Sequence, residues 1–154
     1  MTDWKYIWNR DKKIYLVFVV CYLACIGNDC VFGYIDEHFY HGMVANPIDS
    51  ESIKIRFFTG CVIAPLLETF LFQYLLFEIL KAVKIKNTFI LILLPSLLFG
   101  LGHCYSWMYV LAAFITGLIF NALYLYCINR QLKAFWIVAL LHCMCNLLAL
   151  FSSL

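Results

Sequence analysis

Long apolar runs alternate with short polar connections along the chain. Five of these runs reach or approach the ~20 residues that a helix needs to cross a hydrocarbon layer of ~30 Å. They lie near residues 14–35, 57–80, 88–107, 108–128 and 133–151. No polar linker or internal repeat interrupts the series. The pattern therefore predicts an all-α fold, a polytopic membrane helix bundle of about five transmembrane helices.

Composition supports the same class and excludes several others. Of the 154 residues, 65% are hydrophobic and 13% are charged, whereas soluble domains carry about 25% charged residues. The net charge of +2 is not gathered into a basic patch interleaved with aromatic residues, so no nucleic acid is expected as a partner. We expect a single integral, multi-pass domain over 1–154, placed in the lipid bilayer, which is the cytoplasmic membrane if the source is bacterial. It divides into an anchor helix with an outward-facing connection (1–56) and a four-helix core (57–151).

The basic residues predict how the bundle is oriented. Lys54 and Arg56 lie on one side of it. The other nine of the eleven Lys and Arg lie before the first helix, between the second and third, or between the fourth and fifth: Lys5, Arg10, Lys12, Lys13, Lys81, Lys84, Lys86, Arg130 and Lys133. Because cytoplasmic loops carry the excess of Lys and Arg, we expect the N-terminus in the cytoplasm and the C-terminus outside.

The eight cysteines do not form a recognisable metal or disulfide pattern. All of them, from Cys21 to Cys145, fall within the expected spans, and the sequence contains no C-x-x-C. Neither a zinc site nor a disulfide framework is predicted. Small buried packing residues are the usual role of such cysteines.

A few polar side chains lie deep within the apolar runs, where an ionisable group costs several kcal/mol or more. Asn121 follows Gly117 by four residues, which is typical of close helix packing with an interhelical hydrogen bond. The remaining deep polar residues are Glu68, Gln73, His103, His142 and Asn146. Taken singly, either histidine is more often a packing residue than a catalyst, and Glu68 alone could be a neutral acid that donates a hydrogen bond.

Four of these residues converge in depth. Counted from the cytoplasmic helix ends, Glu68, His103, His142 and Asn146 lie about 9 to 15 residues deep, which places them in one layer near the midplane. His142 and Asn146 share a helix face because they are four residues apart. A carboxylate beside an imidazole can deprotonate water, and the other imidazole and the amide can donate to the oxyanion that forms. The combination predicts hydrolytic chemistry.

The same residues form three ordered motifs. The stretch 64–73 reads APLLETFLFQ, Phe99 begins an F-x-x-x-H that ends at His103, and His142 begins an H-x-x-x-N that ends at Asn146. The set resembles the motifs of the CAAX protease and bacteriocin-processing family, also called the Abi family, of intramembrane glutamic endopeptidases. That family has E-E-x-x-x-R after Ala-Pro as its first motif. The resemblance covers roughly residues 57–151 and implies the family's four-helix catalytic core.

Two positions depart from the family's first motif. The second Glu and the Arg of E-E-x-x-x-R are Thr69 and Gln73 here. These positions are four apart on a helix, so an ion pair has become a neutral pair that can still hydrogen-bond. The first Glu, which the resemblance implies to be the catalytic one, is kept as Glu68.

The resemblance implies a role for each residue of the motifs. Glu68 would be the general base, His103 would help to hold and activate water, and His142 with Asn146 would form the oxyanion hole. Phe99, Thr69 and Gln73 would support the site. Family members in eukaryotes trim prenylated C-termini, and bacterial members are linked to peptide maturation and bacteriocin self-immunity. The expected partners are therefore a peptide or protein substrate at the membrane and possibly a precursor peptide or peptide exporter. No cofactor is expected.

Three alternatives remain open beside the intramembrane endopeptidase. The fold could serve a non-catalytic immunity or scaffold protein, because fold does not fix function. Glu68, His103 and His142 could hold zinc in a metallohydrolase, although no H-E-x-x-H is present. A thiol protease is the weakest alternative, because Cys104 and Cys143 are each adjacent to a histidine and point about 100° away from it on a helix.

Overall fold

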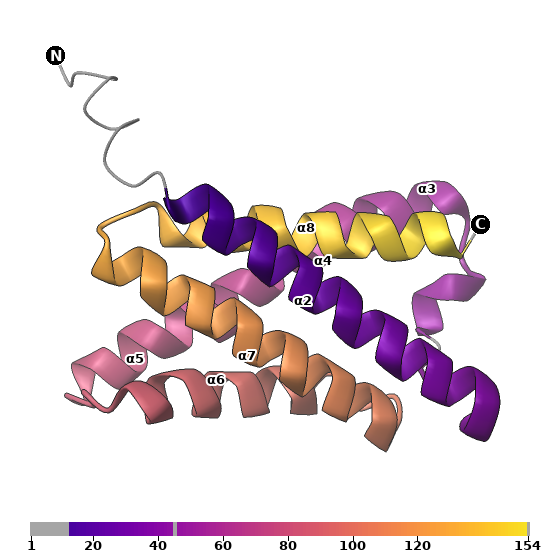
Figure 1. Cartoon of the computed structure of the whole chain (residues 1–154), viewed down its shortest axis with the longest axis horizontal. Helices are drawn as coiled ribbons and strands as arrows, with labels where there is room; N and C mark the ends of the chain where they lie inside the picture. The colour runs from indigo at the N-terminus through magenta and orange to yellow at the C-terminus, as the bar shows by residue number, and fades with distance from the viewer. Residues whose placement is uncertain (1–12, 45, 154) are drawn as a thin grey trace, which may run out of the picture.

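The fold is a bundle of helices that lie side by side (Figure 1), as seen in a computed structural model that describes residues 13–44 and 46–153. Lys5, Arg10 and Lys12 of the predicted basic N-terminus lie outside the described residues. Every regular element in the described part is helical, which confirms an all-α membrane bundle. The long helices are α2 (Lys13–Ile35), α6 (Thr88–Gly102), α7 (Trp107–Asn129) and α8 (Ala134–Ser152). A broken helix between α2 and α6 consists of α3 (Ile53–Ile55), η3 (Arg56–Ile63), α4 (Ala64–Glu68), η4 (Thr69–Leu75) and α5 (Leu76–Ala82).

Four helical segments in the described part of the chain are long and apolar enough to cross a membrane. They are Lys13–Tyr40, Ile53–Ala82, Trp107–Asn129 and Ala134–Ser152. The fifth predicted span, 88–107, is wrong in length, because α6 stops at Gly102 after 15 residues, which is ~22 Å of helix. The number of membrane passes beyond these four stays a prediction.

A short turn separates α6 from α7 where the sequence pattern suggested two abutting helices. The side chain of Ser106 caps α7 by accepting a hydrogen bond from the Tyr109 amide at 3.0 Å, so residues 103–106 leave the helical path. Cys104 lies in this turn and is exposed, which corrects the expectation that all eight cysteines lie within spans. Cys25, Cys61, Cys127 and Cys145 are buried, as packing cysteines would be.

Small residues allow α6 and α7 to approach closely. A methyl group built on Gly100 would lie 2.9 Å from the Val110 carbonyl oxygen. Asn121 donates to the Ser96 hydroxyl of α6 at 3.1 Å and to the Gly117 carbonyl of its own helix at 2.9 Å. The interpretation of Asn121 as a packing amide is therefore confirmed.

The second membrane-spanning helix is irregular at two places. The segments η3 and η4 are π-helical, with the wider five-residue hydrogen-bond spacing. In η3 the Ala64 amide donates to the Thr59 carbonyl, five residues back. Pro65 follows and has no amide hydrogen to continue this ladder. Glu68 therefore lies on a single regular helical turn, α4, between two widened ones.

The first helix is fixed to α7 by one polar side chain. Asn28 of α2 donates to the Ala112 carbonyl and to the Thr116 hydroxyl, both at 3.0 Å. This contact sets the rotation of an otherwise apolar helix whose window hydropathy is 2.0. The connection that follows, which contains η1 (Asp36–Tyr40) and η2 (Pro47–Ser50), folds back on α7, where the Ser106 hydroxyl donates to the Met43 carbonyl.

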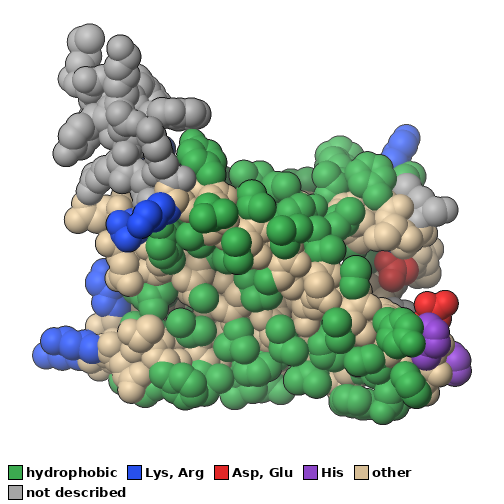
Figure 2. Space-filling model, viewed as in Figure 1, with side chains coloured by type: hydrophobic (Ala, Val, Ile, Leu, Met, Phe, Trp, Pro, Cys, Tyr) green, Lys and Arg blue, Asp and Glu red, His purple; other side chains and the backbone are tan. Residues whose placement is uncertain are grey.

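On the face drawn in Figure 2, charged side chains gather at the two ends of the bundle, and the region between them is largely hydrophobic. Most of the Lys and Arg visible on this face lie at the end where α5 stops and α8 begins, and the visible acidic and His side chains lie at the opposite end. The apolar belt between them is what a bilayer-spanning bundle requires. The cytoplasmic location of the basic end stays a prediction.

Gly100 and Gly27 offer a matched test of the close packing of α6 on α7. In Gly27→Ala the added methyl group meets no atom within 4 Å. This variant should leave the unfolding free energy unchanged or slightly raised, because Ala has a higher helix propensity than Gly. Gly100→Ala, whose methyl would press on backbone, should lower it by about 1–3 kcal/mol. Thermal unfolding of both variants in detergent measures the difference. Equal stability would mean that α6 and α7 are not held at this distance.

Candidate active site

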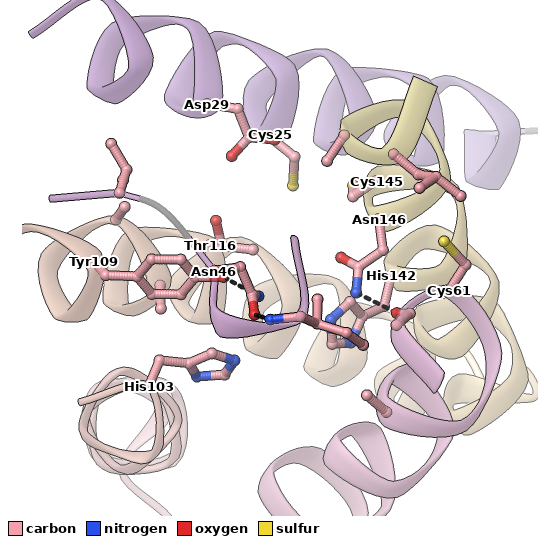
Figure 3. Close-up of a pocket in the computed structure, with 18 of the residues that line it drawn as sticks. Cys25, Asp29, Asn46, Cys61, His103, Tyr109, Thr116, His142, Cys145 and Asn146 are labelled. Carbon is pink, nitrogen blue, oxygen red and sulfur yellow. Dashed lines mark hydrogen bonds between the residues drawn. The ribbon is translucent and has the colours of Figure 1, made fainter. Parts of the chain in front are cut away.

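A cavity of about 570 Å³ lies inside the bundle, and the four predicted catalytic residues lie on its wall. Glu68 of α4, His103 after α6, and His142 and Asn146 of α8 all line it. Figure 3 shows the two imidazoles and the Asn146 amide directed into the same space. Residues that are far apart in the sequence therefore meet at one place.

Glu68 lies between the two histidines. Its Oε2 is 3.5 Å from Nε2 of His103 and 3.6 Å from Nε2 of His142. Both distances exceed those of a direct hydrogen bond, and catalytic contacts in sites without substrate are often this long. The Glu68 side chain is 25% exposed, against 15% and 5% for the two histidines. The carboxylate is thus the most accessible of the three groups.

The end of α6 fixes the orientation of the His103 ring. Because the helix stops at Gly102, the Phe99 carbonyl has no amide four residues ahead to accept from, and Nδ1 of His103 lies 2.7 Å from it. A carbonyl only accepts, so Nδ1 carries the hydrogen in this contact. Nε2 of His103 then presents its lone pair toward Glu68. The Tyr109 ring stacks on His103 with centroids 5.8 Å apart and planes inclined by 14°.

His142 is held as the other tautomer, with its ring hydrogen on the opposite nitrogen. Its Nδ1 is buried and has no hydrogen-bond partner among the described residues, so the hydrogen of a neutral ring belongs on Nε2, which faces Glu68. Phe120 and Phe99 pack on the ring, with centroids 4.7 and 5.8 Å away. The two imidazoles therefore offer one acceptor and one donor to the same carboxylate.

Asn146 has a contact that the sequence analysis did not anticipate. Its Nδ2 donates to the Gly60 carbonyl at 2.8 Å. In the π-helical register of η3 that carbonyl would accept from residue 65, which is a proline without an amide hydrogen. One amide hydrogen of Asn146 replaces the missing donor, and the other remains available on the cavity wall. The signal in the sequence is Pro65 placed five residues after Gly60.

Thr69 and Gln73 are buried beneath the site rather than on the cavity wall. Both are 0% exposed, and neither is among the residues that line the cavity. The hydrogen bond that this neutral pair could make is not formed, because Thr69 Oγ1 and both polar atoms of the Gln73 amide have no partner among the described residues. The cause is the π-helical turn: in η4 residues four apart no longer lie directly above one another.

Several residues of the cavity wall were missed by sequence reasoning. Asn46 donates to the Tyr109 hydroxyl at 2.9 Å and so ties the connection after α2 to the ring that stacks on His103. Its signal in the sequence is the capping pattern N-P-I-D, in which Asn46 and Asp49 cap η2. The first helix, expected only as an anchor that closes one side, also contributes Cys25 and Asp29 to the wall.

The described residues contain no group of three or more His, Cys, Asp or Glu side chains with the geometry to hold a metal ion. Glu68 and the two Nε2 atoms come nearest to such a group.

A comparison against known families agrees with the motif spacing. The sequence matches the model of the type II CAAX prenyl endopeptidase Rce1-like family over residues 50–148, more than half of its 154 residues. The chain belongs to this family. The resemblance to the CAAX proteases is thereby confirmed, and the match includes Glu68, His103, His142 and Asn146. No curated protein and no solved structure matches the chain significantly.

The two departures from the first CAAX-protease motif should behave as a unit. Gln73 is fully buried, so Gln73→Arg alone introduces an uncompensated charge and should destabilise the protein by several kcal/mol. Adding Thr69→Glu should recover much of that loss, because the widened turn still leaves long side chains within reach of each other. Unfolding midpoints in detergent measure both.

Gln73→Met is the matched control, because it keeps the volume and removes the unpartnered amide. It should be neutral or stabilising, since a buried polar group without a partner costs about 1–3 kcal/mol. If the single Arg variant were as stable as the parent, the proposed dependence of one position on the other would be wrong.

Proposed function

We propose that the chain is an intramembrane endopeptidase in which Glu68, assisted by His103, activates water to hydrolyse a peptide bond. The observation that carries this proposal is the carboxylate of Glu68 on a cavity wall between two imidazole Nε2 atoms, at 3.5 and 3.6 Å. A protease family, a cavity of about 570 Å³ and an apolar bundle support it together.

The two histidines take different roles because their rings are held differently. Glu68 and the Nε2 lone pair of His103 both accept hydrogen bonds, so a water can donate one hydrogen to each and present its oxygen to the substrate. His142, with its hydrogen on Nε2, and the second amide hydrogen of Asn146 are donors suited to a developing oxyanion. The geometry thus supports His103 for water activation and His142 for oxyanion stabilisation.

The reaction then balances without a further reactant. The water oxygen forms a bond to the scissile carbonyl carbon as Glu68 takes a proton from it. The carbonyl oxygen becomes an oxyanion that His142 and Asn146 stabilise. When the carbon–nitrogen bond breaks, the protonated Glu68 gives its proton to the departing amine. The carboxylate is regenerated together with a free carboxyl end and a free amino end.

The substrate follows from the location of the site. A cavity enclosed by membrane-spanning helices receives peptides that are themselves held in or at the bilayer, and the family description points to a prenylated peptide end. A precursor peptide supplied beside a peptide exporter is the bacterial form of such a substrate. In both cases the enzyme is a multi-pass protein with its basic end in the cytoplasm.

Glu68→Gln tests the general base. The amide keeps the shape of the side chain but cannot accept a proton, so peptide hydrolysis should fall by at least 10²-fold while insertion and accumulation stay normal. Glu78→Gln is the matched control, because Glu78 is an acid of the same helix near its cytoplasmic end that pairs with Lys81 at 3.6 Å. Residual activity above about a tenth of the parent would contradict a catalytic Glu68.

Metal analysis of the same preparations separates the zinc alternative. The proposed mechanism expects hydrolysis to survive a strong chelator and the purified protein to carry well under one zinc per chain. Stoichiometric zinc, with activity lost on its removal and restored on its return, would establish a metallohydrolase instead.

Asn146 can be tested separately for catalysis and for helix support. Asn146→Ala removes the donor to the Gly60 carbonyl and should lower both stability and rate, the rate by about 10²-fold. Pro65→Ala restores a backbone amide five residues after Gly60. The double variant should therefore regain stability while its rate stays low. Unfolding midpoints and kcat of the single and double variants measure this.

Pro65→Ala alone is the control for the added amide hydrogen and should retain activity. If the double variant regains its rate together with its stability, Asn146 acts through the backbone of η3 and not on the oxyanion. The oxyanion assignment would then rest on His142 alone.

A further inference from the structure

Asp29 is an acidic residue on the cavity wall for which the proposed hydrolysis has no use. It lies in α2, a largely apolar membrane-spanning helix with a window hydropathy of 2.0, it is exposed, and it lines the cavity together with Cys25, one turn earlier on the same face. In Figure 3 both side chains point from α2 toward the interior of the cavity. An ionisable residue in such a helix is unfavourable and is retained where it has a partner or a function.

The charges of the cavity wall leave Asp29 without a counter-ion. The carboxylates on the wall are Asp29, Asp49 and Glu68. Among the described residues that line the cavity, the one Lys or Arg is Arg56. Arg56 is already engaged, since it pairs with Asp49 at 3.1 Å and donates to the Ser153 hydroxyl. Glu68 has the two imidazoles. No described residue donates a hydrogen bond to Asp29 or forms an ion pair with it.

The contacts of the neighbouring residue place Asp29 along the cavity. Asn28 bonds to Ala112 and Thr116 of α7, and Tyr109 of the same helix stacks on His103. From Tyr109 to Thr116 is two helical turns, or ~10 Å along the axis. An extended peptide covers that length with about three residues. A substrate side chain within about three residues of the cleaved bond is therefore in reach of Asp29.

We propose that Asp29 forms a subsite for a cationic side chain, Lys or Arg, of the peptide substrate. The substrate would bring the missing counter-ion to Asp29, which is exposed on the cavity wall, and the two groups would form a charge-assisted ion pair. This inference rests on the proposed function, because it names the chemical class of peptide that the same cavity accepts.

Binding to the inactive Glu68→Gln protein tests the subsite without requiring turnover. The probes are fluorescent lipidated peptides in nanodiscs that differ at one position, with Lys, Met or Glu placed in turn within three residues of the susceptible bond. The Lys peptide should bind at least tenfold more tightly than the Met peptide at one of these positions. Asp29→Asn, which is isosteric, should remove that preference, and Asp29→Lys should transfer it to the Glu peptide.

Glu37→Gln is the matched control, because Glu37 is an exposed acid that follows α2 outside the cavity wall, and it should keep the Lys preference intact. If the peptides bind, but the ratios of their affinities are the same in the Asp29→Asn protein as in its parent, the Asp29 subsite alone is overturned. Failure of every peptide to bind, whatever its charge, would overturn the proposed function together with the subsite.

Discussion

The structure depends on how one carboxylate is accommodated inside an apolar bundle. Glu68 lies in a helix that crosses the membrane, where an isolated charge costs several kcal/mol. His142, whose Nε2 hydrogen faces Oε2 at 3.6 Å, and the opening of the carboxylate onto the cavity, where the side chain is 25% exposed, reduce that cost, and His103 completes the site with Nε2 at 3.5 Å. The two histidines come from the turn after α6 and from α8, so three segments distant in the sequence have to meet at this point. The early end of α6 brings His103 to this point, and the irregular second span brings Glu68 there.

The site and the broken backbone around it support each other. A helix that ends inside a bundle leaves carbonyl groups without amide partners, and these cannot be left unpaired away from water. His103 donates a hydrogen bond to the Phe99 carbonyl at the end of α6. Asn146 donates one to the Gly60 carbonyl, which has no amide partner because residue 65 is a proline. Both side chains also face the cavity. The residues with the proposed chemical roles are thus oriented by the same hydrogen bonds that repair the helices, which is an economical source of preorganisation.

Much of this arrangement is predictable from the sequence, and the failures have physical causes. Hydropathy located α2, α7 and α8 to within one or two residues, because the bilayer dictates the length of a span. Counting residues from the helix ends found the layer shared by Glu68 and the histidines. The end of α6 was placed five residues too late, because hydropathy does not register Gly102 as a helix stop or Ser106 as the N-cap of α7. The hydrogen bond that regular helical spacing would allow between Thr69 and Gln73 is not formed, because that spacing does not hold in a π-helical segment.

Hydropathy also gives no information about the rotation of an apolar helix, and for α2 that rotation determines what the cavity presents. Asn28 sets it through two hydrogen bonds to α7, and Asp29 and Cys25 then lie on the wall. The family match begins at residue 50, after α2. The wall is therefore assembled from two sources. The matched segment contributes Glu68 and the imidazoles, whereas a helix outside it contributes a carboxylate and apolar surface. Since α2 and α7 meet through the contacts of Asn28, the proposed recognition of substrate on α2 can change without moving the groups proposed to activate water.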